Sequence, residues 1–554
     1  MKHAAIFASL LLAPVPFGTA QEVDLEVVHR IKQEAFEGSK VMDHLFYLTD
    51  VNGPRLTNSP GYRKAAEWAA ATLRGWGLAN AGLEPWGEFG RGWSLERFEA
   101  HLLEPSYAPL DGIPLAWSGS TDGPVSGPLV RAPLFERWEE DKAWDLGELD
   151  AAIDAYIEAR RGTLAGRIVL LSPEPALTPP TEPDAKRLDA ERIGELAEAP
   201  TPSPEPAWDW PDLDIPRDPE KRREWFAHAP VDVQAAVWAR QGKAWARLTR
   251  FLKEEGAVAA LTTDTRGSGA LLFAEEVGPF WEKDASIPPP VVVLAPEQYG
   301  RIVRLVNHEM PVKVELDVRV TFNEDDLDGY NVVAEIPGGA KKDEVVLVGG
   351  HLDSWHAGTG ATDNAAGCAV ALEAIRILKS LDLKLDRTVR VALWGGEEQG
   401  IFGSRGYVRK HYGDPVTMEL LPEHETFSGY FNLDNGGGKI RGVYLQENDM
   451  MRPVFSAWLA PFADLDVGTI SIRNTSGTDH LSFDAVGLPG FQFIQDPLDY
   501  GSRTHHSDID VYDHVVPADL MQASAVMASV LYHAANREKK LPRKPRPRPL
   551  AERE

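Results

Sequence analysis

The chain has 554 residues and is too long for one compact core, so two or three domains are expected. Its 84 Asp and Glu residues outnumber 57 Lys and Arg residues and give a formal net charge of −27. This charge argues against nucleic acid and anionic membrane surfaces as partners, because Lys and Arg would have to outweigh the carboxylates locally. A soluble, self-repelling globular protein is expected.

The first 20 residues have the layout of a secretory signal peptide. A charged start is followed by an apolar stretch over residues 4–17 and by the small residues Gly18, Thr19 and Ala20. The apolar stretch is too short to cross a bilayer comfortably, and an uncleaved anchor is the alternative interpretation. We therefore expect cleavage near Ala20, a secreted or periplasmic protein, and no stable membrane insertion.

The next two parts of the chain differ in their predicted secondary structure. Residues 21–105 begin with helical periodicity and include a helix from about residue 61 to 76. Residues 106–322 contain short strand-like runs and are interpreted as an inserted β-rich domain. Within that domain, residues 173–230 form a Pro-rich and acidic excursion whose role the sequence does not reveal.

From residue 323 to 537, strands alternate with helices. This alternation predicts a mainly parallel sheet with helices on both faces, so the fold class is α/β with an inserted β-rich domain. Residues 538–554 are rich in Pro, Arg and Lys and are predicted to be a disordered basic tail. The expected strands are 331–336, 344–348, 388–393, 429–433 and 491–494, and a helix is expected over 365–379.

Five side chains that can bind zinc occur in the predicted α/β region, several of them directly after strand-like runs. Ligands gather at the carboxyl ends of strands in an open α/β sheet, so these side chains are expected to meet. A single His or Asp at a strand end is more often structural, and the prediction depends on their coincidence. As a set they suit two Zn²⁺ ions that share a carboxylate. The candidate metal ligands are His351, Asp363, Glu398, Asp434 and His506.

Two further carboxylates are expected to support this site. Asp353 follows His351 by two residues, a spacing that would let its carboxylate accept the second N–H of the imidazole and orient the ring. Glu397 is adjacent to Glu398, and two neighbouring carboxylates repel unless a cation or proton compensates them. We expect Glu398 to bind metal and Glu397 to act as the general acid/base that moves a proton from water to the leaving amine.

These residues resemble the motifs of the zinc exopeptidases of the aminopeptidase Y and glutamate carboxypeptidase family. The resemblance extends to residues 48–68, while residues 162–170 and 254–258 resemble the protease-associated domain that many members carry as an insertion. The matching motifs are His351-Leu352-Asp353-Ser354, Gly360-Ala361-Thr362-Asp363-Asn364, Gly396-Glu397-Glu398-Gln399-Gly400, Leu433-Asp434 and His506-Ser507-Asp508-Ile509-Asp510.

The resemblance implies a role for each ligand. Asp363 would bridge two zinc ions; one ion would take His351 and Asp434, and the other would take Glu398 and His506.

Chemistry alone does not decide between the neighbours His505 and His506. The family pattern places a carboxylate four residues after the last ligand, which fits His506 with Asp510. Some relatives have a Tyr just before that ligand, where it supports the tetrahedral intermediate. Here His505 stands in that position, so His505 or Tyr500 is the candidate oxyanion donor.

The leading interpretation is a dinuclear zinc exopeptidase that acts on peptides or dipeptides, as an aminopeptidase or a dipeptidase. The alternatives are glutamate carboxypeptidase activity, a non-catalytic binding protein on the same fold, cyclisation of N-terminal glutamine with one zinc, and a related metallopeptidase group with a separate lid domain. A carboxypeptidase needs an Arg clamp, for which Arg405 and Arg473 lie in suitable loops. The sequence leaves open the side-chain preference and the oligomeric state, for which a homodimer is one arrangement.

Overall fold

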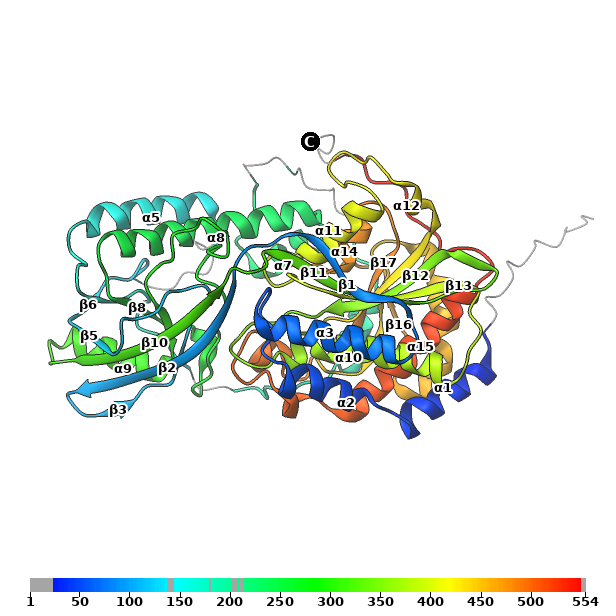
Figure 1. Cartoon of the computed structure of the whole chain (residues 1–554), viewed down its shortest axis with the longest axis horizontal. Helices are drawn as coiled ribbons and strands as arrows, with labels where there is room; N and C mark the ends of the chain where they lie inside the picture. Colours follow the sequence, from blue (N-terminus) through cyan, green and yellow to red (C-terminus); the bar gives the residue numbers. More distant parts are fainter. Residues whose placement is uncertain (1–22, 137–143, 179–180, 202–207, 209–212, 550–554) are drawn as a thin grey trace, which may run out of the picture.

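The computed structural model describes residues 23–136, 144–178, 181–201, 208 and 213–549, so the expected signal peptide lies outside the described residues. The chain forms two parts that lie side by side in Figure 1. We call them the main body, which is built on an eight-stranded sheet, and the lobe, which extends from one end of it between residues 92 and 323. Across the described ranges, no helix combines the length and the apolar character needed to cross a membrane.

The sheet of the main body is parallel at its centre and antiparallel toward its edges. Strands β13, β12, β14 and β17 run parallel to one another, while β11 pairs antiparallel with β13 and β15 pairs antiparallel with β17. The α/β fold with its parallel strands is confirmed. In spatial order the strands are β1 (Ala79–Glu88), β11 (Asp328–Ile336), β13 (Arg387–Trp394), β12 (Lys341–His351), β14 (Phe427–Asn432), β17 (Gly490–Gln495), β15 (Ile440–Tyr444) and β16 (Thr469–Ser471).

Both faces of this sheet are covered, because its central strands are apolar on both sides. Val346 and Val348 of β12 join one buried cluster, and Val345 and Leu347 join another on the opposite face. The first cluster includes side chains of α1 (Leu25–Glu37), α2 (Val41–Phe46), α3 (Pro60–Gly75), α10 (Ala366–Ser380), α13 (Arg452–Leu459) and α15 (Pro517–Asn536). The second includes side chains of α11 (Phe402–His411) and α14 (His480–Asp484), and the short α12 (Pro422–Thr426) lies beside β12.

A buried carboxylate ties helix α10 to the N-terminal helices. Glu373 is fully buried, accepts hydrogen bonds from Lys40 N at 2.9 Å and Arg376 Nε at 2.8 Å, and lies 3.2 Å from His44 Nε2. Burial alone would raise the pKa of Glu373, but the contacts with His44 and Arg376 outweigh it and lower the pKa to about 2.

We predict that Glu373 makes the protein sensitive to acid. A folded-state pKa below the unfolded value means that this carboxylate stabilises the fold above about pH 4.5, and that the stabilisation is lost as the pH falls toward 2. Glu373→Gln should lower the free energy of unfolding at neutral pH by on the order of 2 to 3 kcal/mol and flatten the decline between pH 4.5 and 2. Urea unfolding across this pH range measures both effects. If the variant lost stability between pH 4.5 and 2 as steeply as the wild type, this role of Glu373 would be contradicted.

The lobe is joined to the main body by two long antiparallel strands, β2 (Gly92–Glu104) and β10 (Lys313–Asn323) (Figure 1). With β3 (Ala108–Pro109) and β5 (Val125–Gly127) they form a four-stranded sheet. The second sheet of the lobe has the order β4 (Gly112–Pro114), β9 (Val291–Leu294), β8 (Ala259–Thr262), β7 (Ile168–Leu170) and β6 (Leu129–Arg131). The first strand of the lobe along the chain is β2, which begins at residue 92.

The second sheet of the lobe is packed on both faces. Side chains of α5 (Leu146–Arg160) and α8 (Val231–Glu254) share a buried cluster with one face. Side chains of β2, β10 and α9 (Pro296–Asn307) share a cluster with the other. The assignment of this lobe to the protease-associated type stays a prediction.

Two segments expected to be irregular make specific contacts. The excursion includes α6 (Ala190–Ala197) and α7 (Pro219–His228), and Trp208, Ile215 and Trp225 form a small apolar cluster with α8. Residues 538–549 belong to the segment that the sequence predicts to be a disordered tail, and here Arg543 donates to the carbonyls of His424 and Phe427 at 2.8 and 2.7 Å. Free backbone carbonyls on the main body therefore bind this basic segment.

Candidate metal centre

The five candidate ligands meet at the carboxyl ends of the central strands of the sheet. His351 ends β12, Glu398 follows β13 and Asp434 follows β14, while His506 lies in the loop after β17. Asp363 lies in the short turn Ala361–Ala365 that leads into α10, and the backbone at Asp363 is not helical, with φ −129° and ψ 89°. The parallel central strands bring these loops together, since their carboxyl ends lie at the same edge of the sheet.

Two groups of side chains share Asp363. His351 Nε2 lies 3.3 Å from Asp363 Oδ1 and 3.3 Å from Asp434 Oδ1. His506 Nε2 lies 3.3 Å from Asp363 Oδ2 and 3.1 Å from Glu398 Oε2. The two carboxylate oxygens of Asp363 thus face two different sets of ligands, which is the arrangement of a bridging carboxylate.

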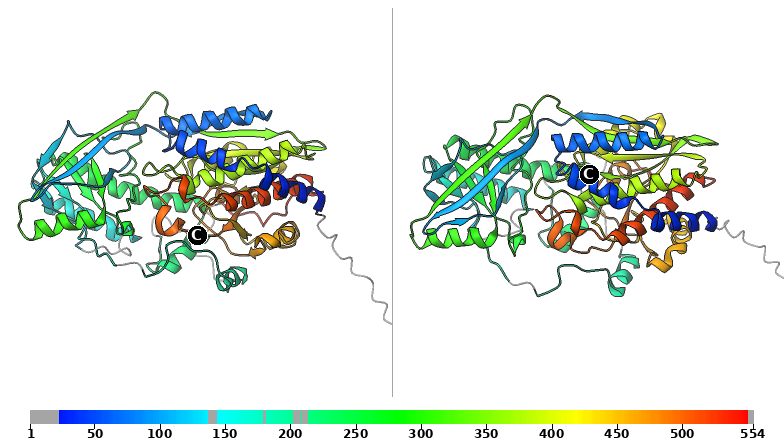
Figure 2. Two further views of the ribbon diagram at one scale, coloured as in Figure 1. Left: turned by 90° about the horizontal axis from the view of Figure 1, so that it is seen from below. Right: turned by 60° about the horizontal axis from the view of Figure 1, so that its bottom comes forward.

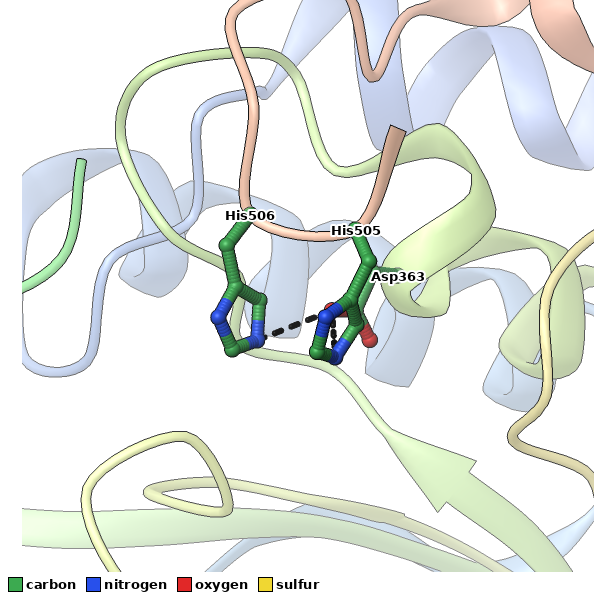
Figure 3. Close-up of side chains that lie close together, drawn as sticks. All are labelled: Asp363, His505 and His506. Atoms are coloured by element: carbon green, nitrogen blue, oxygen red, sulfur yellow. Dashed lines mark ion pairs between the residues drawn. The ribbon is translucent and has the colours of Figure 1, made fainter. Parts of the chain in front are cut away.

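His505 also approaches this centre. Its ring stacks on that of His506 with 3.7 Å between centroids, and its Nε2 lies 3.7 Å from Asp363 Oδ2. Figure 3 shows both imidazoles beside the Asp363 carboxylate. Burial and the neighbouring His506 lower the pKa of His505 to about 4, so His505 is neutral at pH 7. Only His506 of this pair also contacts Glu398.

The ring of Tyr500 lies 4.9 Å from that of His505. Burial, reinforced by Asp363, raises the pKa of Tyr500 well above its ordinary value, so its hydroxyl keeps its proton.

The chemistry of the cluster fits bound cations. Asp363 Oδ2, Glu398 Oε1 and Asp434 Oδ1 are buried and accept no hydrogen bond of normal geometry from the described residues. Burial, reinforced by Asp363, raises the pKa of Glu398 to about 8. Buried carboxylates that lack donors are costly unless a cation compensates them, and two imidazoles with three carboxylates form a ligand set that zinc accepts. A small pocket beside the cluster is lined by Trp355, Gly358, Gly360, Asp363, Glu398, His506, Ser507 and Asp510.

Asp353 is at the centre, but its contacts differ from those expected. His351 Nδ1 bonds the backbone carbonyl of Asp353 at 3.0 Å, whereas the Asp353 carboxylate is 3.7 Å away, beyond hydrogen-bond distance. The carboxylate instead accepts the backbone N–H groups of Glu397 and Glu398, both at 3.2 Å, and the hydroxyl of Thr57 at 3.0 Å. Asp353 therefore orients His351 through its backbone and holds the Glu397–Glu398 turn through its side chain.

The carboxyl group of Glu397 has a strongly raised pKa. Burial raises its pKa well above the ordinary value, opposed by His351 and reinforced by Asp434. A raised pKa suits a carboxylate that must both accept and release a proton near neutral pH.

The partner of His506 was not found from the sequence. His506 Nδ1 lies 2.8 Å from Oε1 of Glu275, which belongs to the lobe. Asp510, four residues after His506, accepts hydrogen bonds from the N–H and hydroxyl of Thr362, both at 2.7 Å, and from Asp363 N at 3.1 Å. Because 231 residues separate Glu275 from His506, no local spacing could have found this pair.

Arg55 is a second residue that motif spacing did not single out. It is fully buried, and its guanidinium donates to the carbonyls of Leu352, Thr359 and Gly360 at 2.6, 2.6 and 2.9 Å. A fourth bond reaches Leu48 O at 2.9 Å. Arg55 thus joins the N-terminal part of the chain to the loops that carry His351 and Asp363.

We predict that Arg55→Ala lowers the free energy of unfolding by roughly 3 kcal/mol or more, since each unsatisfied buried acceptor costs about 1 to 3 kcal/mol. Urea unfolding measures this loss. Arg63→Ala is a matched control, because Arg63 is half exposed in its pair with Glu67, and its removal should cost less than about 1 kcal/mol. Equal effects of the two substitutions would refute the structural role of Arg55.

Part of the excursion lies against the loop that carries His505 and His506. We call residues 182–197 the strap; Figure 2 shows this segment along the main body. Lys186 N donates to Leu498 O at 2.9 Å, and Arg187 pairs with Asp496 and Asp519, both at 2.8 Å. Asp184 pairs with Arg503 at 2.9 Å. The strap therefore supports the loop after β17.

Comparisons with known proteins agree with this geometry. Residues 331–531 match the model of Peptidase family M28. Carboxypeptidase Q of Xenopus laevis is 29% identical over 290 residues, which cover 52% of this chain and 58% of that protein. Carboxypeptidase Q of Rattus norvegicus is 34% identical over 218 residues, 39% of this chain and 44% of that protein. Aminopeptidase YwaD of Bacillus subtilis is 29% identical over 210 residues, with coverages of 37% and 44%. The chain thus spans about half the length of the curated relatives it matches.

Solved structures share the fold over most of the chain. A peptidase M28 precursor from Shewanella amazonensis has a TM-score of 0.63 at 24% identity and covers 94% of this chain and 98% of its own. A zinc aminopeptidase from Bacillus subtilis has a TM-score of 0.50 at 19% identity, with coverages of 90% and 95%. The chain therefore shares its fold with solved peptidases, one of which is a zinc aminopeptidase. Within the chain, residues 331–531 match peptidase family M28, in agreement with the resemblance drawn from the motifs.

Proposed function

We propose that this chain is an exported dinuclear zinc exopeptidase that removes terminal residues from peptides or splits dipeptides. The observation that carries the proposal is the position of Asp363, whose two oxygens each lie 3.3 Å from an imidazole nitrogen of a different ligand set. One zinc ion would be held by His351, Asp434 and Asp363 Oδ1. The other would be held by Glu398, His506 and Asp363 Oδ2.

The chain's own residues would share the work of peptide hydrolysis. Two bound zinc ions would supply Lewis-acid polarisation of the scissile carbonyl and lower the pKa of a water. Glu397 would take the proton of the attacking water and deliver it to the leaving amine. Asp353 would hold Glu397 in place through the backbone bond at 3.2 Å.

His505 and Tyr500 are the candidate oxyanion donors. Both can donate a hydrogen bond at neutral pH. The pKa of His505 is lowered to about 4, so its imidazole is neutral and has one N–H. The pKa of Tyr500 is raised, so its hydroxyl keeps the proton. Of the two, His505 lies at the centre, with its Nε2 3.7 Å from Asp363 Oδ2. We therefore favour His505.

The contacts of two arginines favour an aminopeptidase or dipeptidase. Arg405 pairs with Asp232 at 2.5 Å, and Arg473 donates to the carbonyl of Glu195 at 3.0 Å. Both arginines that were candidates for a carboxylate clamp are thus bound to groups of the lobe or the excursion. A carboxypeptidase of the glutamate type needs a cationic group directed at the substrate carboxylate.

A zinc-loaded activity screen tests the proposal. Unblocked, N-blocked and C-blocked peptides are compared, with the zinc content of the same sample measured by mass spectrometry. We expect two zinc ions per chain and hydrolysis that requires a free amino terminus. Hydrolysis only of N-blocked peptides with a free carboxylate would indicate a carboxypeptidase instead. The absence of turnover would favour a binding protein.

A further inference from the structure

A short segment of the lobe lies along the loop that carries His506. Phe273 and Ser507 form an antiparallel β-bridge. Ala274 N donates to His506 O at 3.2 Å, and Asp508 N donates to Leu272 O at 2.9 Å. The backbone of the lobe is therefore paired with the backbone of the metal-ligand loop on both sides of Ser507.

This pairing places one lobe carboxylate against the imidazole of His506. Glu275 Oε1 lies 2.8 Å from His506 Nδ1, and the opposite ring nitrogen, Nε2, faces Glu398 at 3.1 Å and Asp363 at 3.3 Å. A hydrogen bond at Nδ1 fixes the tautomer in which Nε2 has a free lone pair for a metal. Arg266 lies 3.6 Å from the same Glu275 oxygen and limits where that carboxylate can move.

The backbone of His506 needs such external support. Its φ is 65°, a left-handed conformation that a side chain with a Cβ adopts at a cost. The bond from Ala274 N to His506 O and the bond from His506 Nδ1 to Glu275 together constrain the backbone and the ring. Both come from the lobe.

We propose that Glu275 is a positioning residue of the metal centre, through which the lobe sets the zinc affinity of the Glu398–His506 ligand set. The proposal rests on the proposed function, because it presumes that His506 binds zinc. The lobe then acts on the centre itself. Removal of the Glu275 carboxylate leaves the ligands in place but removes the group that orients one of them.

Zinc binding measured by chelator competition, with no substrate present, tests this role. The Asp434→Asn background is useful because it disables the His351 set, so that the remaining binding step reports the Glu398–His506 set. In that background, Glu275→Gln should weaken zinc binding by roughly 10- to 100-fold, and Glu275→Ala should weaken it at least as much. In the Glu398→Gln background, where the His351 set remains, the same substitution should change zinc affinity by less than about threefold.

Glu276→Gln is the matched control. It removes the neighbouring carboxylate of the same segment, which interacts with His506 only through its charge, so it should change both binding steps less than Glu275→Gln does. Co²⁺ absorption spectra of the Glu275 variants provide a second measurement, with a changed ligand-field band expected only for the Glu398–His506 set. Equal zinc affinities for wild type and Glu275→Gln would overturn the proposal, as would an equal loss in Glu276→Gln. If wild-type protein binds fewer than two zinc ions, the proposed function fails instead.

Discussion

Glu397→Gln is expected to lower kcat by roughly 10² to 10⁴ while the protein keeps both zinc ions. The amide matches the carboxylate in size but cannot accept the proton of the attacking water. Because the base must be ionised to act, wild-type activity should fall as the pH drops through its pKa, and burial places that pKa above the usual range for Glu. This fall of kcat/KM at low pH should be absent in the variant. Steady-state kinetics across pH, with zinc content determined on the same samples, measure both effects.

A matched control for Glu397→Gln is Glu423→Gln. Glu423 is an exposed acid on α12 that pairs with His411, and its substitution should leave kcat and zinc content unchanged. Full activity in a zinc-replete Glu397→Gln variant would exclude Glu397 as the proton carrier. Loss of zinc in the same variant would mean instead that Glu397 is a ligand.

Asp363→Asn is expected to weaken the binding of both zinc ions, because the two Asp363 oxygens face two ligand sets. Asp434→Asn should weaken one ion only, since Asp434 contacts the His351 set. Loss of both ions removes several kcal/mol of transition-state stabilisation, so the activity of Asp363→Asn should fall by about 10³-fold or more. Isothermal titration calorimetry with zinc distinguishes a variant that has lost one zinc-binding step from a variant that has lost both.

The fold of the Asp363→Asn variant should be retained. The substitution is close to isosteric, and the backbone N–H of residue 363 still donates to Asp510, as in the wild type at 3.1 Å. Thermal unfolding in the presence of a chelator compares the two apo proteins, which should have similar Tm values. A variant that loses only one zinc ion would show that Asp363 is not the bridge.

The central strands could be predicted from the sequence because the signals are local, and the candidate ligands were predicted from their places after those strands. The runs at 344–348 and 388–393 are apolar, and both lie inside the observed strands β12 and β13. The ligands follow those runs directly. A parallel sheet brings successive strand ends to one edge, so the order of motifs along the chain was enough to predict a cluster.

The contacts of individual side chains could not be predicted in the same way. The Asp353 carboxylate was expected at His351, but it binds the backbone of Glu397 and Glu398, because the turn after β13 presents two N–H groups to it. The spacing of Asp510 from His506 was used to choose His506 over His505, but it says nothing of the contacts of Asp510, which binds Thr362 and Asp363. A spacing of two or four residues limits the reach of a side chain and does not choose among the donors within that reach.

The sequence by itself determined the type of sheet, since apolar runs that alternate with helices are a local signal. It also predicts the residues of the centre and separate roles for Glu397 and Glu398, from residue type and from spacing along one strand or turn. Only the tertiary structure decided that Glu275 supports His506, that the strap supports the loop after β17, and that Arg55 joins the loops of His351 and Asp363. These contacts join residues hundreds of positions apart. Their geometry is set by how the lobe and the main body pack, which no local pattern in the sequence records.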